Sequence, residues 1–217
     1  MFKFKKTMMS ILAAVTALSV IGINAAAFGA ATGTVKCGTY LNVRSVDSTS
    51  ASIIGKLYNG AKVTITDGEY GWYKINYGSS TAWINGGYVA FATKQATVVE
   101  NAICFKNVKY VFGGASPSGF DCSGYTMFLY NKVGIALPHS AASRATKGTA
   151  VGRSALIPGD LVFFATDGVT RNITHVGVYV GNNTVLQAQT GSVQKIAAIS
   201  LMNSYWSSAY VSARRLL

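Results

Sequence analysis

The chain has 217 residues and a formal net charge of +12, with 19 Lys and Arg residues against seven Asp and Glu residues. This length predicts one or two domains. The three cysteines are odd in number and widely spaced, which argues against a disulfide framework. The sequence has no C-x-x-C and no H-x-x-x-H pair, which argues against a zinc site. The sequence therefore calls for no metal and no other cofactor.

The amino terminus is typical of a secretory signal peptide. Lys3, Lys5 and Lys6 precede an apolar stretch at residues 8–23, and small residues that suit a signal peptidase follow it. The apolar stretch is short for a membrane anchor. We therefore expect residues 1–31 to be cleaved, leaving no stable membrane anchor and a secreted chain.

Removal of this leader takes away three lysines and leaves a net charge of 12 − 3 = +9. A secreted protein of this charge is expected to associate with anionic polymers of the cell wall. No compact cluster of Lys and Arg with interleaved aromatic residues is present, so we predict no nucleic-acid partner.

Residues 34–92 read as short strands separated by turns. The predicted strands cover 33–37, 61–67, 71–77, 80–85 and 88–91, with turns at Asn59-Gly60, Asp67-Gly68, Tyr77-Gly78 and Gly86-Gly87. No helical period occurs in this segment, which predicts a small β-barrel.

The same segment resembles the bacterial SH3-like domain. The matching stretches are 41–45 (LNVRS), 54–57 (IGKL), 60–63 (GAKV), 71–75 (GWYKI) and 82–84 (AWI), although Val46-Asp47 departs from the family's usual first loop. The resemblance implies a wall-targeting module. Tyr40, Trp72 and Tyr88 are the aromatic residues that could form its binding face.

Residues 97–217 predict an α+β domain, with helices first and an antiparallel sheet after them. The expected helices cover 97–106, 122–133 and 141–146, and the expected strands cover 161–164, 174–180, 184–188 and 210–214, after a strand and loop at 110–114. The junction at 92–96 is short and lacks a flexible Gly/Ser composition, so we expect the two domains to pack against each other.

Cys122 is the first candidate catalytic residue. Asp121 is a natural N-cap, and Tyr125, Phe128, Leu129 and Val133 share one face of the helix that follows. A thiol at a helix N-terminus tends toward the nucleophilic thiolate. The alternative is a buried structural cysteine. Cys104, in an apolar helical stripe, is expected to face a core, and a single Cys37–Cys104 bridge stays open.

His175 begins a predicted strand and is one of two histidines in the chain. A lone histidine is more often structural, but a nucleophilic cysteine needs a base that titrates near neutrality. A Cys122–His175 pair resting as thiolate and imidazolium would attack a carbonyl and then protonate the departing amine.

The C-terminal half resembles the NlpC-type cell-wall peptidases, which are papain-like cysteine hydrolases. The matching stretches are 110–114 (YVFGG), 119–124 (GFDCSG), Leu137-Pro138, 158–164 (PGDLVFF) and 175–181 (HVGVYVG). The resemblance implies a papain-like domain with a cysteine-bearing helix packed on an antiparallel sheet. It also implies Cys122 as nucleophile, His175 as base, Tyr110 beside the attacked carbonyl, and Asp121 and Ser123 in the substrate pocket.

Two positions depart from this family. His139 follows Leu137-Pro138 where arginine is frequent, and we interpret it as a loop residue. Gln187 occupies the position of a frequent third histidine, and its amide oxygen can accept a hydrogen bond. A hairpin with a three-residue loop at 181–183 would place Gln187 opposite Gly177 and diagonal to His175. Gln189, opposite His175 in that register, is the rival.

The leading hypothesis is a secreted, wall-associated endopeptidase that cleaves peptidoglycan stem peptides, which the resemblance places between D-glutamate and the diamino acid. A non-catalytic wall-binding protein is the first alternative, and the intact Cys122 and His175 argue against it. Amidase or acyl-transfer chemistry on the same scaffold is the second, because an amine can resolve an acyl-enzyme as well as water.

Overall fold

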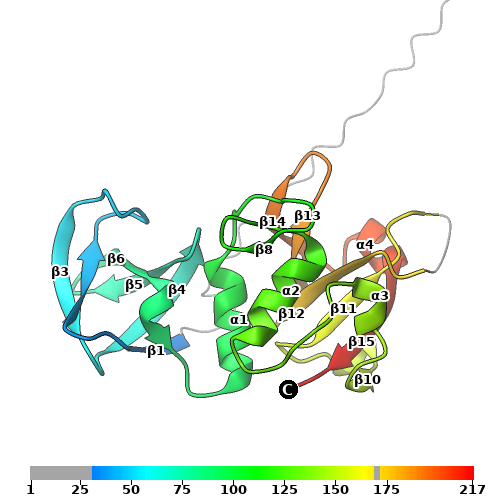
Figure 1. The fold of residues 1–217 in the computed structure, drawn as a ribbon, viewed down its shortest axis with the longest axis horizontal. Coiled ribbons are helices and arrows are strands. Elements are labelled where there is room, and N and C mark those ends of the chain that lie inside the picture. Colours follow the sequence, from blue (N-terminus) through cyan, green and yellow to red (C-terminus); the bar gives the residue numbers. More distant parts are fainter. Residues whose placement is uncertain (1–30, 169–171) are drawn as a thin grey trace, which may run out of the picture.

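The computed structural model describes residues 31–168 and 172–217. The predicted leader, 1–31, lies outside the described residues except for Ala31, which begins the first strand. The chain forms an N-terminal all-β domain and a C-terminal α+β domain, with helix α1 (Lys94–Cys104) standing between the N-terminal sheet and the rest of the C-terminal domain (Figure 1).

The N-terminal domain is one curled antiparallel sheet in the order β3-β2-β6-β5-β4-β1-β7. Along its strands, inward residues such as Val43, Ile65 and Ile84 are fully buried and alternate with more exposed neighbours, as a pleated strand requires. The edge strands β3 and β7 do not pair, so the predicted barrel is not closed by hydrogen bonds. The strands are β1 (Ala31–Val35), β2 (Tyr40–Arg44), β3 (Ile53–Tyr58), β4 (Lys62–Glu69), β5 (Trp72–Tyr77), β6 (Ser80–Asn85) and β7 (Val89–Ala90).

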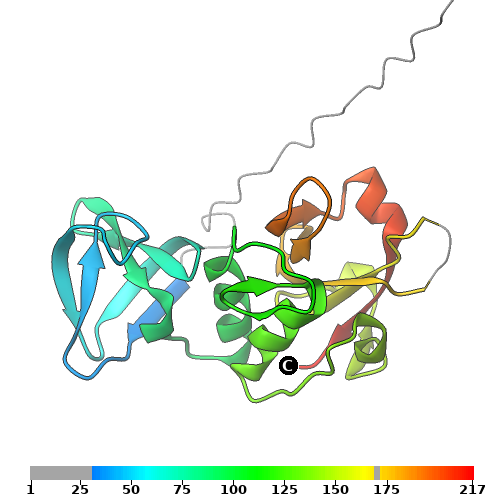
Figure 2. The same ribbon diagram turned by 45° about the horizontal axis from the view of Figure 1, so that its top comes forward.

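The C-terminal domain packs helices against a six-stranded antiparallel sheet of order β10-β15-β11-β12-β13-β14 (Figures 1 and 2). This is the predicted α+β arrangement. Its elements are α2 (Cys122–Asn131), α3 (Ala141–Arg144), α4 (Ser204–Ala209), the short pair β8 (Ala115–Ser116) and β9 (Gly119–Phe120), β10 (Thr149–Val151), β11 (Leu161–Phe164), β12 (His175–Gly181), β13 (Thr184–Gln189), β14 (Lys195–Ser200) and β15 (Tyr210–Arg215).

Helix α2 buries the face that the apolar spacing predicts. Tyr125 and Leu129 are fully buried, and the rings of Phe105, Phe120 and Phe128 pack edge-on or tilted with centroids 5.0 to 5.9 Å apart. Such aromatic pairs contribute about 0.5 to 1.5 kcal/mol each beyond the area they bury. This cluster packs α2 against the end of α1 and against β9, and it thereby fixes the position of the first residue of α2.

The two domains share a contact built on α1 and the end of β4. Lys106 pairs with Asp67 at 2.6 Å, and Asn107 donates to Glu69 over the same distance. The backbone approaches closely as well: a Cβ on Gly68 would lie 2.9 Å from the Cα of Cys104. The expectation that the domains pack together is therefore confirmed.

Several local predictions were wrong. Asp67-Gly68 is not a turn but lies within β4 beside a β-bulge, and the chain reverses at Tyr70-Gly71, where both residues have positive φ. Residues 110–114 form a loop, with one isolated bridge from Tyr110 to Phe120 instead of a strand. The prediction also lacked β10, β14 and α4, and it assigned no strand to β2 or β3.

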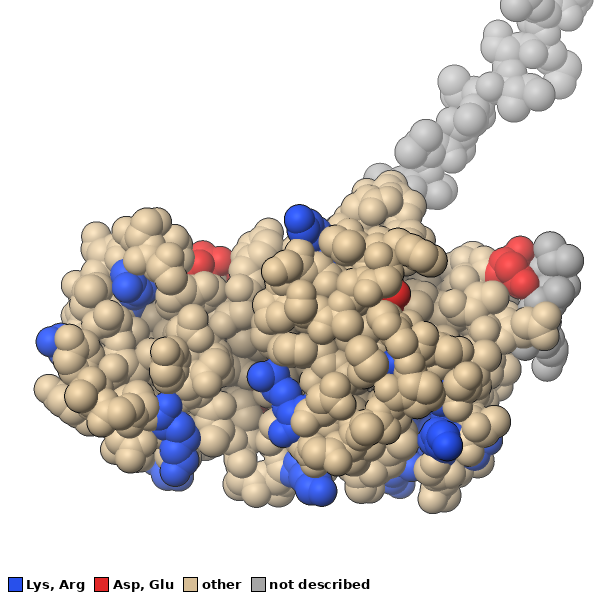
Figure 3. All heavy atoms as spheres, viewed as in Figure 1, with Lys and Arg blue, Asp and Glu red and all other residues tan. Residues whose placement is uncertain are grey.

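Basic side chains are scattered over both domains in the view of Figure 3, and most of those visible lie toward its lower edge. Within residues 31–168 and 172–217, no helix is long and apolar enough to cross a membrane. In the same residues, no cluster of three or more His, Cys, Asp or Glu side chains could hold a metal ion.

Candidate active site

Cys122 is the first residue of α2, with Asp121 as its N-cap as predicted. The Oδ1 atom of Asp121 accepts a 2.6 Å hydrogen bond from the Gly124 amide. The first turn also lies against the preceding loop, because a Cβ on Gly124 would stand 1.9 Å from the carbonyl oxygen of Gly114. Only glycine at position 124 therefore allows the first turn of α2 to pack this closely on the loop that contains Gly114.

Strand β12 brings His175 to the same place. Helix α2 packs on β12, and the backbone amides of Val176 and Ser123 lie close enough to the Cys122 thiol to lower its pKa. Since Val176 directly follows His175, the thiol and the imidazole come from adjacent positions of two packed elements. The structure thus joins the two residues that the sequence separates by 53 positions.

Gln187 orients the imidazole from β13. Its Oε1 is the hydrogen-bond partner of His175 Nε2, and its Nε2 donates to Gln189 Oε1 at 3.2 Å. The second bond fixes the amide with its oxygen toward the imidazole, so His175 Nε2 carries the hydrogen and donates it. The other ring nitrogen, Nδ1, is then unprotonated and free to accept the thiol proton.

The hairpin has the predicted register but reaches it by a different turn. Val178 pairs with Leu186 and Tyr179 with Val185, which places Gln187 beside Gly177. The loop holds two residues, Asn182 and Asn183, both at positive φ, whereas we predicted three. A β-bulge between Tyr179 and Gly181 absorbs the extra residue and preserves the register.

The resting charges of the pair differ from the prediction of a thiolate and an imidazolium. Burial and then the charge of Asp121 raise the pKa of the Cys122 thiol, and they outweigh the amides and the Arg144 cation that lower it. Burial lowers the pKa of His175 to about 4, against the opposing effects of Gln187 and Asp121. Both groups are therefore neutral in the free site near pH 7, because desolvation exceeds the stabilisation at the helix N-terminus.

Asp121 and His139 form a pair that the sequence did not predict. The Nε2 atom of His139 lies 3.0 and 3.1 Å from the two carboxylate oxygens of Asp121, which also accept hydrogen bonds from Ser123 and Gly113. Burial alone would raise the pKa of Asp121, but the bonds from Gly124, His139 and Ser123 lower it overall. His139 is a loop residue, as expected, but it contacts the N-cap of the cysteine helix.

A cleft of about 500 Å³ opens beside His175. The ring of Trp206 lies 5.9 Å from the imidazole of His175 and is tilted by 38°, so it covers part of that imidazole. The half-buried Tyr110 lies near Cys122: burial, and then the charges of Cys122 and Asp121, raise its pKa. The cleft is lined by Thr166, His175, Gln189, Thr190, Asn203, Ser204, Tyr205 and Trp206.

The aromatic face predicted for the N-terminal domain is only partly exposed. Tyr40 and Tyr88 are 44% and 48% exposed, and the Lys56 ammonium lies 3.9 Å from the Tyr40 ring centroid. Trp72 is only 8% exposed and belongs to the core, so its assignment to a binding face was wrong. Its position directly after the Tyr70-Gly71 turn places it at the packed end of β5.

The remaining cysteines are not bridged. Cys37 and Cys104 are both free thiols, and Cys104 is buried where α1 meets the N-terminal domain. A Cβ on Gly86 would lie 2.4 Å from the Cys104 sulfur, which shows how closely that domain approaches. Burial raises the pKa of Cys104 far above that of a free thiol. Cys104 is therefore a packing residue rather than a second nucleophile.

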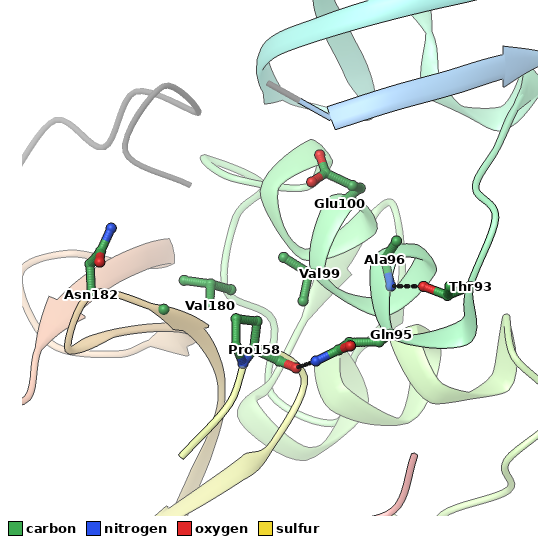
Figure 4. A pocket seen from close by; sticks show the side chains of 9 residues that line it. Thr93, Gln95, Ala96, Val99, Glu100, Pro158, Val180 and Asn182 are labelled. Atoms are coloured by element: carbon green, nitrogen blue, oxygen red, sulfur yellow. Dashed lines mark hydrogen bonds between the residues drawn. The ribbon is translucent and has the colours of Figure 1, made fainter. Parts of the chain in front are cut away.

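A second hollow of about 410 Å³ lies away from this site, between α1 and the tip of the β12–β13 hairpin (Figure 4). Gln95 closes one side through a 2.6 Å hydrogen bond to the Pro158 carbonyl. Glu100 lies at its edge toward the N-terminal domain, 7% exposed, and its Oε2 atom has no hydrogen-bond partner. This hollow is at the opposite end of β12 from His175 and holds no nucleophile.

Comparison with known proteins matches both halves of the chain. Residues 107–215 match the NlpC/P60 family model, and residues 27–90 match the bacterial SH3 domain model. The structure of NlpC2 from Trichomonas vaginalis superposes with a TM-score of 0.52 at 26% identity, over 86% of this chain and 72% of that one.

Two curated relatives are similar in sequence. The gamma-DL-glutamyl hydrolase of Bacillus subtilis is 36% identical over 64% of this chain and 35% of its own length. The murein DD-endopeptidase MepS/murein LD-carboxypeptidase of Escherichia coli is 37% identical over 57% of this chain and 63% of its own length. The chain thus spans about one third to two thirds of the length of these relatives.

Proposed function

Because the chain belongs to the NlpC/P60 family, we propose that it is a cysteine endopeptidase that hydrolyses peptidoglycan stem peptides. The observation that carries this proposal is the arrangement around Cys122. Its sulfur lies at a helix N-terminus beside β12, and the base on β12 is held by Gln187 with Nδ1 unprotonated. This is the arrangement that nucleophilic catalysis by a thiol needs.

The reaction proceeds through an acyl-enzyme. As the substrate carbonyl approaches, His175 Nδ1 takes the proton from Cys122 Sγ, and the sulfur forms a bond to the carbonyl carbon. The tetrahedral oxyanion is stabilised by the Tyr110 hydroxyl, and the imidazolium then protonates the departing amine as the C–N bond breaks. Water, deprotonated by the same nitrogen, hydrolyses the thioester. The neutral resting pair makes proton transfer part of the attack.

The bond cleaved is proposed to be that between D-glutamate and the diamino acid. The name of the Bacillus subtilis relative, gamma-DL-glutamyl hydrolase, supports this assignment, whereas the Escherichia coli relative is named for DD-endopeptidase and LD-carboxypeptidase activities. Mass spectrometry of fragments released from purified peptidoglycan discriminates these bonds. Fragments that end in D-glutamate are expected, and release only of uncleaved stems from their cross-links would overturn the assignment.

Cys122→Ala is expected to abolish hydrolysis without loss of the fold, because no other residue can form the thioester. The measurement is release of soluble stem-peptide fragments, with the thermal unfolding midpoint as the test of folding. Cys37→Ser is the matched control, since this half-buried thiol is free and lies in the other domain. Wild-type turnover by Cys122→Ala would contradict the assigned nucleophile.

The N-terminal domain is proposed to bind the wall, and the protein to act outside the cell after removal of residues 1–31. The match to the bacterial SH3 domain supports the first part. The exposed rings of Tyr40 and Tyr88 supply faces on which sugars or stem peptides can stack. Anionic wall polymers would add a non-specific, salt-sensitive attraction to a chain of this positive charge.

A further inference from the structure

Arg144 is a fully buried cation next to the cysteine helix. It ends the short helix α3 and is 0% exposed. Its Nε atom donates to the Pro138 carbonyl at 2.6 Å, and Nη1 donates to the Thr126 hydroxyl on α2. The third nitrogen, Nη2, is buried with no hydrogen-bond partner. A guanidinium with one unsatisfied nitrogen is a costly group to place in a protein core.

The contacts of Arg144 lead to the first turn of α2. Thr126, which accepts from Arg144, lies within 3.3 Å of the Cys122 carbonyl and 3.2 Å of the Ser123 carbonyl through its own hydroxyl. Pro138, the second partner, directly precedes His139, which binds Asp121. Arg144 therefore supports the segment that carries the nucleophile from two sides.

No carboxylate pairs directly with Arg144 among the residues that the structure describes. Burial lowers its pKa to about 10, so it is still a cation at neutral pH, and the negative charges that act on it belong to Cys122 and Asp121. Asp121 already bonds His139, Ser123 and two backbone amides. The charge of Arg144 thus has no full counterpart while the Cys122 thiol is neutral.

We propose that Arg144 is a positioning residue whose buried charge stabilises the Cys122 thiolate as the proton passes to His175. The groups that act on the sulfur are Asp121 at the N-cap, Tyr110 from the loop, the Val176 amide from β12, the Ser123 amide from α2, and Arg144 from α3. Of these, Arg144 is the permanent cation. Opposite charge favours the ionised form of a thiol, and low local polarity strengthens that effect.

Two substitutions separate the charge from the hydrogen bonds. Arg144→Gln keeps polar donors toward Thr126 and Pro138 but removes the charge, and Arg144→Lys keeps the charge but loses the planar fork. For each variant, the rate of Cys122 alkylation by iodoacetamide is measured against pH, with the modified peptide identified by mass spectrometry. Alkylation needs no peptidoglycan, so its outcome does not depend on the proposed function.

Arg144→Gln is expected to raise the alkylation midpoint by roughly one pH unit and to lower kcat about tenfold with little change in KM. Arg144→Lys is expected to keep an alkylation midpoint and a kcat close to those of the parent protein. Arg153→Gln removes the same charge from an exposed site and should leave the midpoint unchanged. An unchanged midpoint in a folded Arg144→Gln protein would overturn the proposal, as would equal shifts in the Gln and Lys variants. Folding is checked by the thermal unfolding midpoint.

Discussion

Two glutamine side chains on β13 set the tautomer of the His175 imidazole. Gln189 accepts from the amide nitrogen of Gln187, and Gln187 accepts from His175, so the three polar groups point their donors in one direction. A neutral amide can hold the imidazole in this tautomer without competing for the proton. A second histidine would add a titrating group there, whereas glutamine keeps the orientation independent of pH.

Gln187→Ala is expected to lower kcat about tenfold, less than the ~100- to 10,000-fold typical of a group that transfers the proton itself. The reason is that Nδ1 can still accept the thiol proton, but less often in the right tautomer and orientation. Gln187→His should keep much of the activity, and Gln189→Ala should cost less than Gln187→Ala. Steady-state kinetics on a soluble stem peptide measures each value. Full activity of Gln187→Ala would remove this residue from the site.

At this scale, sequence reasoning succeeds where one motif fixes the geometry, and it missed the tertiary surroundings of Trp72 and Arg144. Asp121, Cys122 and the following turn are local, so an N-cap and a helix N-terminus could be read directly. Trp72 could not be placed, because a tryptophan in a small sheet has the same pattern whether its ring faces the core or solvent. The partners of Arg144 come from other elements, and nothing in the short run 141–145 distinguishes a buried arginine from an exposed one.

The β12–β13 hairpin shows why register matters more than turn length. We predicted this register from a three-residue loop, and the observed register is the predicted one although the loop holds two residues. The residue that the loop lacks lies in a β-bulge between Tyr179 and Gly181, and no sequence pattern in 179–183 predicts that bulge. By contrast, β14 and α4 were missed because each has only six residues. A segment this short shows too few repeats of a strand or helix pattern to be recognised.

Gly177→Ala is expected to destabilise the protein by about 1 to 3 kcal/mol and to reduce kcat as well. A Cβ at this position would lie 2.4 Å from Val185 Cγ1 and 3.1 Å from Gln187 Cβ, so β13 must move and carry Gln187 with it. Gly152→Ala is the matched control, since nothing lies within 4 Å of its Cβ position and its φ is −68°. Urea unfolding gives the free-energy change. Equal stability of the two variants would contradict this account of the hairpin.

The whole molecule is organised by α1, which belongs to the catalytic domain yet packs on the N-terminal one. The short junction allowed this packing to be predicted, but not the groups it would bury. Tyr73, Cys104 and Glu100 lie close enough for the charges of the last two to raise the pKa of Tyr73, after the larger effect of burial. The domain contact is therefore polar as well as apolar, and one of its groups titrates near neutral pH.

Glu100 should make the stability of the whole molecule depend on pH. Burial raises its pKa from 4.5 to about 7, so between these pH values the folded state binds more protons than the unfolded state. Stability from this group is then fully present below pH 4.5 and is lost as the pH rises toward 7, by on the order of 3 kcal/mol. The loss reflects the cost of ionising a carboxyl whose Oε2 has no partner.

Glu100→Gln removes this titration while keeping the shape of the side chain. The variant is expected to be more stable than the parent at pH 8, by up to about 3 kcal/mol, and to differ little from it at pH 5. Urea unfolding of both proteins at the two pH values measures the difference, and Asp47→Asn, which removes a carboxylate from the loop between β2 and β3, is the control for the loss of one negative charge. A Glu100→Gln protein whose advantage is the same at pH 5 and pH 8 would show that burial does not raise the pKa of Glu100 in the folded state.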